Sequence, residues 1–293
     1  MEIKRGNFYL EQWEDILKVY WNLDKLIYTG KTDFQKVVIG NNAYIGVFLA
    51  LDGKIQSSEF DEYIYHEALV HPAMLNAYPV KNVLIIGNGE GCATREVLKY
   101  NSVESLDWVD LDEKVVSICR NKLPYSWKGN DPRTNLVFMD GYKFLKETAR
   151  TNKKYDVILM DLTEYNQNVP LSNKLFGYEA LKLIKSILTK NGSLVTQCTN
   201  ILKNGDVEIK NVPTLIDRAF KYKRTMHIFV PSFLSEYRLV LATDKSDPIN
   251  LPKSKIQKII EPFVNSLRYY DGEYHRSLMT LPREARVYGR KTF

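Results

Sequence analysis

The first sixty residues alternate short apolar or β-branched runs with turns that contain glycine or asparagine. Three such runs are Leu26–Tyr28, Gln35–Ile39 and Tyr44–Leu51. Asp52-Gly53 follows the last run, and an Asp-Gly pair in that position is a strong hairpin signal. The pattern predicts a small antiparallel β domain over residues 1–62 and a helix near residues 61–74.

Beyond residue 62, apolar strands alternate with amphipathic helices. We expect strands at residues 82–86, 105–109, 135–139, 156–160, 192–197, 226–230 and 238–242. We expect helices at residues 93–99, 113–122, 142–147, 178–189, 212–220 and 256–267. Strands regularly spaced by helices are typical of a parallel sheet covered on both faces. Residues 63–293 are therefore expected to form an α/β domain with a Rossmann-like, doubly wound, mostly parallel sheet.

Composition narrows the class of protein. Of 293 residues, 44% are hydrophobic and 26% are charged, which is ordinary for a globular chain. Apolar runs stay far below the roughly 18–20 residues needed to cross a bilayer. Met1–Arg5 is not followed by the apolar region of a secretory signal. Three widely separated cysteines predict reduced thiols and a cytoplasmic location.

The net charge of +6 does not by itself indicate a nucleic-acid partner. Lysine and arginine are interspersed with 35 acidic residues, and the chain contains neither a long basic block nor zinc-finger spacing. We therefore expect small-molecule substrates, with no nucleic acid and no membrane as partner.

A glycine-rich turn follows the first strand of the α/β region. Val83–Ile86 lead into Gly87-Asn88-Gly89-Glu90-Gly91-Cys92 and then into a helix. Glycines in such a turn let the backbone approach a ligand, and the helix N-terminus usually meets an anion. Here Glu90 already places a carboxylate at that point, which favours a cationic ligand group over a phosphate. A tight turn that binds nothing is the alternative.

Acidic residues also end the next three strands, as Asp110, Asp140 and Asp161. Doubly wound sheets bind ligands at this edge, and an acid about 20 residues after the first glycine commonly binds ribose hydroxyls. Asp140 is suited to accept from an adenine amine. Each acid alone could simply cap a helix. Together with Glu90 they would repel one another unless a cation bound between them, which favours S-adenosylmethionine or its decarboxylated form over NAD or ATP.

At this point the chain resembles the polyamine aminopropyltransferases, which are the spermidine, spermine and thermospermine synthases. The motifs that carry the resemblance are Leu51–Gln56 with Asp61–Glu67 and His71-Pro72, Gly87–Cys92 with Arg95–Leu98, Tyr155–Asp161, and Leu267–Asp271 with His275 and Leu281-Pro282. The resemblance implies aminopropyl transfer from decarboxylated S-adenosylmethionine as co-substrate, no tightly bound cofactor, and a homodimer or homotetramer.

The resemblance also implies roles for individual residues. The implied donor-binding residues are Gln35, Gln56, His66, Gly87, Glu90, Asp110, Leu111, Asp140 and Gly141. Tyr65 and Asp161 fall on the transfer site and are the implied catalytic residues. We expect the acceptor to bind at Tyr65, Asp161, Glu164, Phe233 and Tyr237. For Phe233 and Tyr237, aromatic core packing is an equally simple interpretation.

The chemistry needs a neutral amine beside a sulfonium. A free alkylamine, with a pKa of about 10.4, is protonated at neutral pH, so a carboxylate at Asp161 could take its proton. Simple electrostatic holding of the cation is the alternative role. Tyr65 could orient the amine, and Glu164 could hold a second positive charge. Glu90 would pair with the ammonium of the decarboxylated donor, whereas it would repel the carboxylate of S-adenosylmethionine itself.

The acceptor is less defined than the donor. Glu90, Asp110, residues 57–71 and Pro231–Phe233 resemble the thermospermine synthase branch. Asp161-Leu162-Thr163-Glu164-Tyr165 departs from the usual family loop, which carries a second aspartate followed by proline. We expect conversion of spermidine to thermospermine or spermine, or of putrescine to spermidine. An S-adenosylmethionine-dependent methyltransferase and a non-catalytic polyamine-binding homologue are the alternatives.

The histidines do not predict a metal site. His66 and His71 are five residues apart, so on a helix their rings diverge, unlike the four-residue spacing of a zinc protease. We expect His71 to be structural and His227 to be a satisfied core residue, and we leave His275 unassigned. Gln197, at a strand end, could line the site or simply pack.

Overall fold

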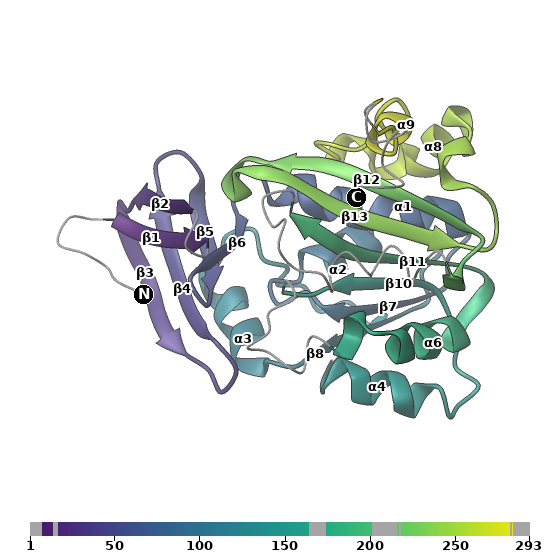
Figure 1. The fold of residues 1–293 in the computed structure, drawn as a ribbon, viewed down its shortest axis with the longest axis horizontal. Coiled ribbons are helices and arrows are strands. Elements are labelled where there is room, and N and C mark those ends of the chain that lie inside the picture. Colours follow the sequence, from purple (N-terminus) through teal and green to yellow (C-terminus); the bar gives the residue numbers. More distant parts are fainter. Residues whose placement is uncertain are drawn as a thin grey trace.

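The computed structural model describes residues 8–13, 17–163, 174–200, 216, 218–281 and 283. Its N-terminal part consists of two antiparallel sheets, on the left of Figure 1. The first sheet pairs β1 (Phe8–Trp13) with β2 (Leu17–Asn22). The second is a meander of β3 (Lys25–Lys31), β4 (Lys36–Asn42), β5 (Gly46–Leu51) and β6 (Lys54–Ser58). The Asp-Gly turn joins β5 to β6, and both of its residues have positive φ, as the hairpin signal predicts.

The remaining strands form a seven-stranded sheet in the order β12-β13-β11-β10-β7-β8-β9. Their bounds are β7 (Asn82–Gly87), β8 (Ser105–Asp110), β9 (Thr134–Phe138), β10 (Tyr155–Asp161), β11 (Leu188–Asn200), β12 (Tyr222–Val230) and β13 (Ser235–Thr243). Within this sheet β13 runs antiparallel to both of its neighbours, while β11, β10, β7, β8 and β9 are mutually parallel. The expectation of an antiparallel β domain before a mostly parallel Rossmann-like sheet is confirmed.

Helices cover both faces of the seven-stranded sheet (Figure 1). Their bounds are α1 (Glu62–Ala77), α2 (Cys92–Leu98), α3 (Glu113–Lys122), α4 (Gly141–Thr148), α6 (Tyr178–Ile187), α8 (Lys253–Ile260) and α9 (Tyr274–Leu278). Short 3₁₀ turns are η1 (Lys174–Phe176), η2 (Pro231–Phe233), η3 (Pro248–Asn250) and η4 (Glu261–Ser266). One hydrophobic cluster packs α1, α2 and α8 on one face, and a second packs α4 and α6 on the other.

Two expected helices have different ends in the structure. The helix expected over 256–267 ends at Ile260 and continues as η4, because Pro262 lacks the N–H that would extend the helical ladder. The helix expected over 178–189 ends at Ile187, since Leu188 already pairs with Tyr155 in the sheet. Most of the helix expected over 212–220 lies outside the described residues, although Ile216, Arg218 and Ala219 are helical.

The four-stranded sheet packs directly on α3. Val37, Ile39 and Leu49 form one buried apolar cluster with Val115 and Cys119 of that helix. The covalent connection between the N-terminal sheet and the α/β part is also short, because α1 begins four residues after β6 ends. The N-terminal sheet is therefore held against the end of the seven-stranded sheet that carries the glycine-rich turn.

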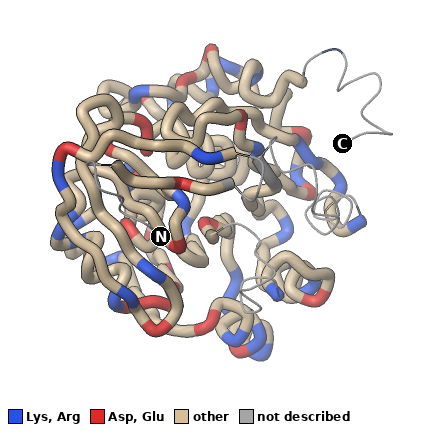
Figure 2. Tube along the Cα trace, turned by 60° about the vertical axis from the view of Figure 1, so that its left-hand side comes forward, with Lys and Arg blue, Asp and Glu red and all other residues tan. Residues whose placement is uncertain are grey.

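The molecular surface mixes both signs of charge. Figure 2 shows lysine and arginine interspersed with aspartate and glutamate along the described trace. Cys92, Cys119 and Cys198 are buried free thiols. Among the described residues, no helix has both the length and the apolar character needed to span a membrane.

Candidate active site

The glycine-rich turn is interlocked with the end of β10. Gly87 has φ +92°, and a Cβ there would lie 1.9 Å from the backbone oxygen of Asp161, so only glycine fits. The next residue, Asn88, donates its N–H to that same oxygen at 3.0 Å. The turn that carries Glu90 is thereby fixed beside Asp161.

Asn88 adopts a backbone conformation in this turn that usually requires glycine. Its φ is +78°, in the left-handed region that asparagine tolerates. Its side-chain oxygen accepts from the N–H of Ala93, and its side-chain amide donates to Thr94, both at 2.9 Å. Asn88 therefore adopts the backbone conformation of glycine and caps the first turn of α2 as well.

Glu90 and Asp161 meet at the imidazole of His66, which is on α1. The Nε2 atom of His66 lies 3.4 Å from a Glu90 carboxylate oxygen and 3.9 Å from an Asp161 carboxylate oxygen. On the other side of the ring, Nδ1 lies 2.7 Å from the backbone oxygen of Glu62 and 3.0 Å from its carboxylate. His66 is 2% exposed and Glu90 is 9% exposed, so these charges interact with little screening by water.

Burial and neighbouring charges shift the pKa values of this group. Burial raises the pKa of Asp161 to about 6 against the opposing attraction of His66, and Glu90 adds to the rise. Burial would lower the pKa of His66, but its contacts with Glu62 and Glu90 outweigh burial and raise that pKa well above 6.5. The imidazole is therefore a cation at neutral pH. The carboxylates of Glu62, Glu90 and Asp161 therefore already surround the positive charge of His66.

Asp110 lies at the end of β8, beside this group. Its carboxylate accepts from the N–H of Asp112 at 2.9 Å. Burial raises the pKa of Asp110 to about 7, and the nearby acids Asp112, Glu90 and Asp161 add to the rise. An acid whose pKa is raised by burial and by neighbouring like charges is stabilised in its ionised form by a bound cation.

Asp112 connects this strand end to the N-terminal sheet. It caps α3 by accepting from the N–H of Val115 at 3.1 Å. Its other carboxylate oxygen accepts from the Thr32 hydroxyl at 2.6 Å and from the Gln35 side-chain amide at 3.1 Å. Gln35 is thus brought beside Asp110, and Leu111 lies half-buried between the two acids.

Asp140 and Gly141 lie at the end of the neighbouring strand. Met139 donates its N–H to the backbone oxygen of Asp110 at 2.9 Å, so the two strand ends are adjacent. Asp140 caps α4, accepting from the N–H of Lys143 at 2.7 Å. A Cβ on Gly141 would lie 2.6 Å from a methyl carbon of Ile86, which explains the glycine.

An aromatic cluster lies next to Asp161. Tyr65 of α1 packs with its ring centroid 5.8 Å from that of Tyr237 and 6.4 Å from that of Phe233. Burial, with Asp161 close by, raises the pKa of Tyr65 well above 10, so its phenol stays protonated. That phenol donates to the side-chain oxygen of Gln197 at 3.2 Å.

Gln197, whose role the sequence left open, lies beside Tyr65. It is 4% exposed, and its side-chain nitrogen has no hydrogen-bond partner among the described residues. It lies on β11 three residues before the end of that strand, directly after Thr196, which pairs with Met160 of β10. Glu164 lies outside the described residues. Gln56, on β6, donates its amide to the backbone oxygen of Lys54 at 3.3 Å.

A salt bridge next to His66 was not predicted from the sequence. One guanidinium nitrogen of Arg95 lies 2.9 Å from both carboxylate oxygens of Glu62. Helical spacing could have revealed only the neighbouring contact between Glu62 and His66, which are four residues apart on α1. Glu62, His66 and Cys92 offer ligand atoms within 4.8 Å of one another. Because Arg95 already brings a positive charge to Glu62, this group fits an ion pair better than a metal ion.

The other histidines have structural partners. His71 is fully buried, with its ring nitrogens 3.1 Å from Glu96 and 3.0 Å from the Tyr100 hydroxyl. His275 bridges the Tyr270 hydroxyl and the backbone oxygen of Pro248. His227 is partly exposed and pairs with Glu236 through Nδ1, while its buried Nε2 has no partner among the described residues, so the expectation of a satisfied core histidine is wrong.

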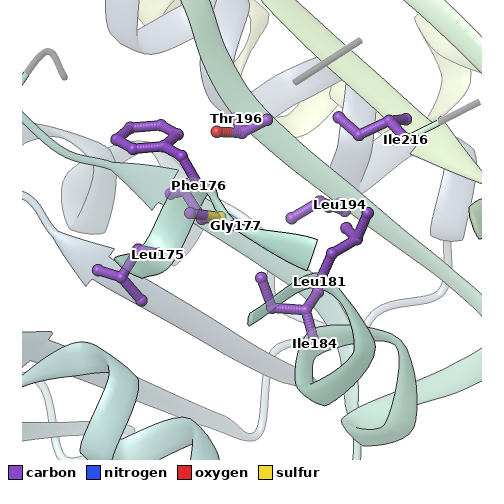
Figure 3. A pocket seen from close by; sticks show the side chains of 9 residues that line it. Leu175, Phe176, Gly177, Leu181, Ile184, Leu194, Thr196 and Ile216 are labelled. Atoms are coloured by element: carbon purple, nitrogen blue, oxygen red, sulfur yellow. The ribbon is translucent and has the colours of Figure 1, made fainter. Parts of the chain in front are cut away.

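A separate apolar pocket lies on the α6 face of the sheet (Figure 3). Its lining residues are Met160, Leu175, Phe176, Gly177, Leu181, Ile184, Leu194, Thr196 and Ile216. None of these side chains titrates, so this pocket cannot supply the acids or bases of a reaction. The acids described above gather around His66 instead.

Comparison with known proteins identifies this arrangement. A profile of the spermine/spermidine synthase domain matches residues 62–253, and one of the spermidine synthase tetramerisation domain matches residues 9–59. A polyamine aminopropyltransferase of Sulfolobus acidocaldarius is 38% identical over 90% of this chain and 87% of its own length. Polyamine aminopropyltransferase 1 of Hyperthermus butylicus is 38% identical over 88% and 89% of the two chains.

Solved structures agree with these relatives. A spermidine synthase in complex with the transition-state analogue AdoDATO superposes with a TM-score of 0.86 at 27% identity, covering 97% of each chain. Spermidine synthase from Thermotoga maritima gives a TM-score of 0.85 at 27% identity, with 97% and 96% covered. Fold and sequence similarity thus define a Rossmann-like transferase. The chain belongs to the spermine/spermidine synthase family.

Proposed function

We propose that this protein transfers the aminopropyl group of decarboxylated S-adenosylmethionine to a polyamine and releases methylthioadenosine. The observation that carries the proposal is the meeting of Glu90 and Asp161 at His66, beside Tyr65, at the carboxyl edge of the sheet. Glu90, Asp161 and the adjacent Asp110 are three buried or nearly buried acids, and together they favour a substrate that brings positive charge.

The donor lies along the ends of β7, β8 and β9 in this proposal. Asp110 binds the ribose hydroxyls, Asp140 and Gly141 bind the adenine, and Glu90 pairs with the aminopropyl ammonium. A methyl carbon of Leu175 lies 3.3 Å from where a Cβ on Gly141 would be. This apolar neighbour supports the binding of an aromatic base at that strand end. The family motifs add Gln35, Gln56, His66, Gly87 and Leu111 to the donor site.

The transfer step is a displacement at carbon. The lone pair of a neutral acceptor nitrogen attacks the aminopropyl carbon next to the sulfonium, and the carbon–sulfur bond breaks with its electron pair returning to sulfur. The nitrogen loses a proton to Asp161, directly or through water. A pKa of about 6 leaves most Asp161 side chains ionised at neutral pH and ready to accept that proton. Holding both reactants in line removes much of the remaining barrier.

The acceptor site is formed by Tyr65, Asp161, Phe233 and Tyr237, with Glu164 as a further acid. We propose spermidine as the first acceptor, giving thermospermine or spermine, and putrescine as the second. Apolar rings beside a carboxylate suit a linear polyamine, because the rings contact methylene groups while the acid interacts with nitrogen.

We also propose that residues 1–62 form an assembly domain, that residues 63–293 form the catalytic domain, and that the chain is a homodimer or homotetramer. The exposed apolar side chains Phe8, Leu17, Tyr20 and Leu26 of the N-terminal sheets support self-association. A cytoplasmic location is proposed because all three cysteines are unpaired. We propose that nucleic acid is not a partner.

The test incubates the purified protein with decarboxylated or ordinary S-adenosylmethionine and with putrescine, spermidine, agmatine or spermine, and identifies all products by mass. We expect methylthioadenosine together with a polyamine extended by one aminopropyl group, from the decarboxylated donor only. Methylated products with S-adenosylhomocysteine would replace the proposal with a methyltransferase. Polyamine binding without any product would replace it with a non-catalytic homologue.

A further inference from the structure

Asp61 is a fully buried carboxylate that the proposed chemistry does not use. It lies between β6 and α1 and is 0% exposed. One carboxylate oxygen accepts from the hydroxyls of Ser58 at 2.8 Å and Ser232 at 2.9 Å, and the other accepts from the backbone N–H of Ser232 at 2.6 Å. These hydrogen bonds partly offset the cost of burying the charge, and two of them reach a residue 171 positions away.

Ser232 is the middle residue of η2, the turn that joins β12 to β13. This turn holds Leu234 at φ +53°, a left-handed conformation that is unfavourable for leucine. Such a conformation persists where the surrounding structure fixes it. The Leu234 N–H donates to Pro231 at 3.0 Å inside the turn, and Asp61 holds the turn from outside through both polar groups of Ser232.

The same turn presents Phe233 to the acceptor side of the site. The Phe233 ring centroid lies 5.6 Å from that of Tyr237 and 6.4 Å from that of Tyr65. Asp61 is the N-cap residue of α1, the helix that carries Tyr65 one turn later. A single carboxylate therefore joins the beginning of the helix that bears Tyr65 to the turn that bears Phe233.

We propose that Asp61 and Ser232 act as positioning residues that set the spacing between Phe233 and Tyr65, and thereby the length of polyamine that the acceptor site takes. The inference rests on the proposed function, because it assigns a polyamine to this aromatic cluster. Neither residue touches the reacting atoms. Their effect is expected in acceptor binding and acceptor choice, with donor binding unchanged.

The kinetic test compares Ser232→Ala and Asp61→Asn with the wild-type enzyme, using putrescine and spermidine as alternative acceptors. Loss of one or two buried hydrogen bonds should raise the acceptor KM about 3- to 10-fold and change the spermidine-to-putrescine ratio of kcat/KM, with donor KM unchanged. Ser232→Thr, which keeps the hydroxyl and the N–H, should restore the wild-type ratio.

Ser58→Ala is the matched control. It removes a hydrogen bond to the same carboxylate oxygen of Asp61 but leaves both bonds to Ser232, so acceptor choice should stay as in the wild type. The proposal is overturned if Ser232→Ala and Asp61→Asn keep the wild-type acceptor KM and ratio, if Ser58→Ala changes them equally, or if donor and acceptor KM rise together.

A second measurement does not depend on turnover. Hydrogen exchange of the segment that contains the Ser232 amide should be slow in the wild type and in Ser58→Ala, and faster in Asp61→Asn. Equal exchange in all three would overturn the positioning role even for a fully active enzyme. A wild-type protein that releases no methylthioadenosine with any polyamine would instead overturn the proposed function, and the assignment to acceptor length with it.

Discussion

Asp161 and Asp110 lie in surroundings that favour their protonated forms. Burial is the largest cause for both, and neighbouring acids add to it, giving pKa values of about 6 and about 7. His66 opposes this effect at Asp161 with a positive charge 3.9 Å away. In the proposed function a sulfonium and a polyamine would add further positive charge, so substrate binding would draw these acids toward their ionised forms.

Replacing Asp161 with asparagine should lower kcat by about 10²–10⁴-fold, because the side chain keeps its shape but can no longer take a proton. Donor affinity, measured by calorimetry, should stay within a few-fold of the wild type. In the wild-type enzyme, kcat/KM should fall as the pH drops through about 6, where Asp161 becomes protonated. Near-normal turnover by the variant, or a profile flat from pH 5 to pH 8, would remove the assigned role.

Asp110→Asn should stabilise the free protein. Its folded-state pKa of about 7 lies above the ordinary 3.8, so the carboxyl favours folding below pH 3.8 and loses that contribution as the pH rises toward 7. Asparagine removes the cost of the charge and keeps an acceptor for the Asp112 N–H. We expect a gain of about 1–3 kcal/mol in the free energy of unfolding at pH 8 and almost none at pH 4, measured by urea denaturation. A destabilised variant at pH 8 would contradict this.

At the scale of elements, the strand-to-helix turn after β7 determines where the acids lie. Gly87 is packed against the backbone of Asp161, and Asn88 caps α2 from a left-handed conformation. The sequence predicted this turn and the acids at the adjacent strand ends, because glycine spacing and strand ends are local signals. The roles of Asn88 and of the Glu62–Arg95 pair depend on contacts between elements, so a single sequence showed neither.

Asn88→Gly should cost about 0.5–2 kcal/mol of unfolding free energy, since glycine accepts the positive φ but removes the helix cap. Asn88→Ala should cost more, because alanine loses the cap and also pays the penalty of the left-handed conformation. Chemical denaturation of the three proteins measures the order. Equal stability of the glycine and alanine variants would show that the backbone conformation is not the constraint.

Element ends were predicted less well than element types. Hydrophobic periodicity runs through residues 256–267, yet Pro262 converts the second half of that segment to a 3₁₀ turn. An antiparallel β domain was predicted over residues 1–62, but the strands β1 and β2 were not located within it, because Phe8–Trp13 and Leu17–Asn22 mix charged with aromatic residues and are stabilised by pairing with each other. Glu11 shows this dependence on distant partners. Its buried carboxylate accepts from the Trp21 side chain and from the backbone N–H of Ile55.

At the scale of the whole molecule, hydrogen bonds connect the N-terminal sheet to the proposed donor site. Thr32 and Gln35, in the turn between β3 and β4, both donate to Asp112, which in turn donates its N–H to Asp110. This connection joins residues about 80 positions apart, so no local pattern revealed it. It predicts that the N-terminal sheet affects donor affinity although it lies outside the parallel sheet.

Thr32→Val should weaken donor binding about 3- to 10-fold by removing the 2.6 Å hydrogen bond to Asp112 while keeping the side-chain shape. The acceptor KM should not change. Asp33→Asn is the matched control, because its exposed ion pair with Lys114 joins the same turn to α3 at the surface, where such pairs contribute little. Calorimetry with the decarboxylated donor measures both, and equal effects of the two variants would contradict the role of Asp112.

The most direct test of the central claim, that carboxylates at the rim of the sheet select a cationic donor, compares two donors by calorimetry. Decarboxylated S-adenosylmethionine should bind at least about tenfold more tightly than S-adenosylmethionine, because only the second brings a carboxylate toward Glu90. Glu90→Gln should remove most of that difference. Equal affinity of the two donors for the wild-type protein, or an undiminished preference in Glu90→Gln, would contradict the account.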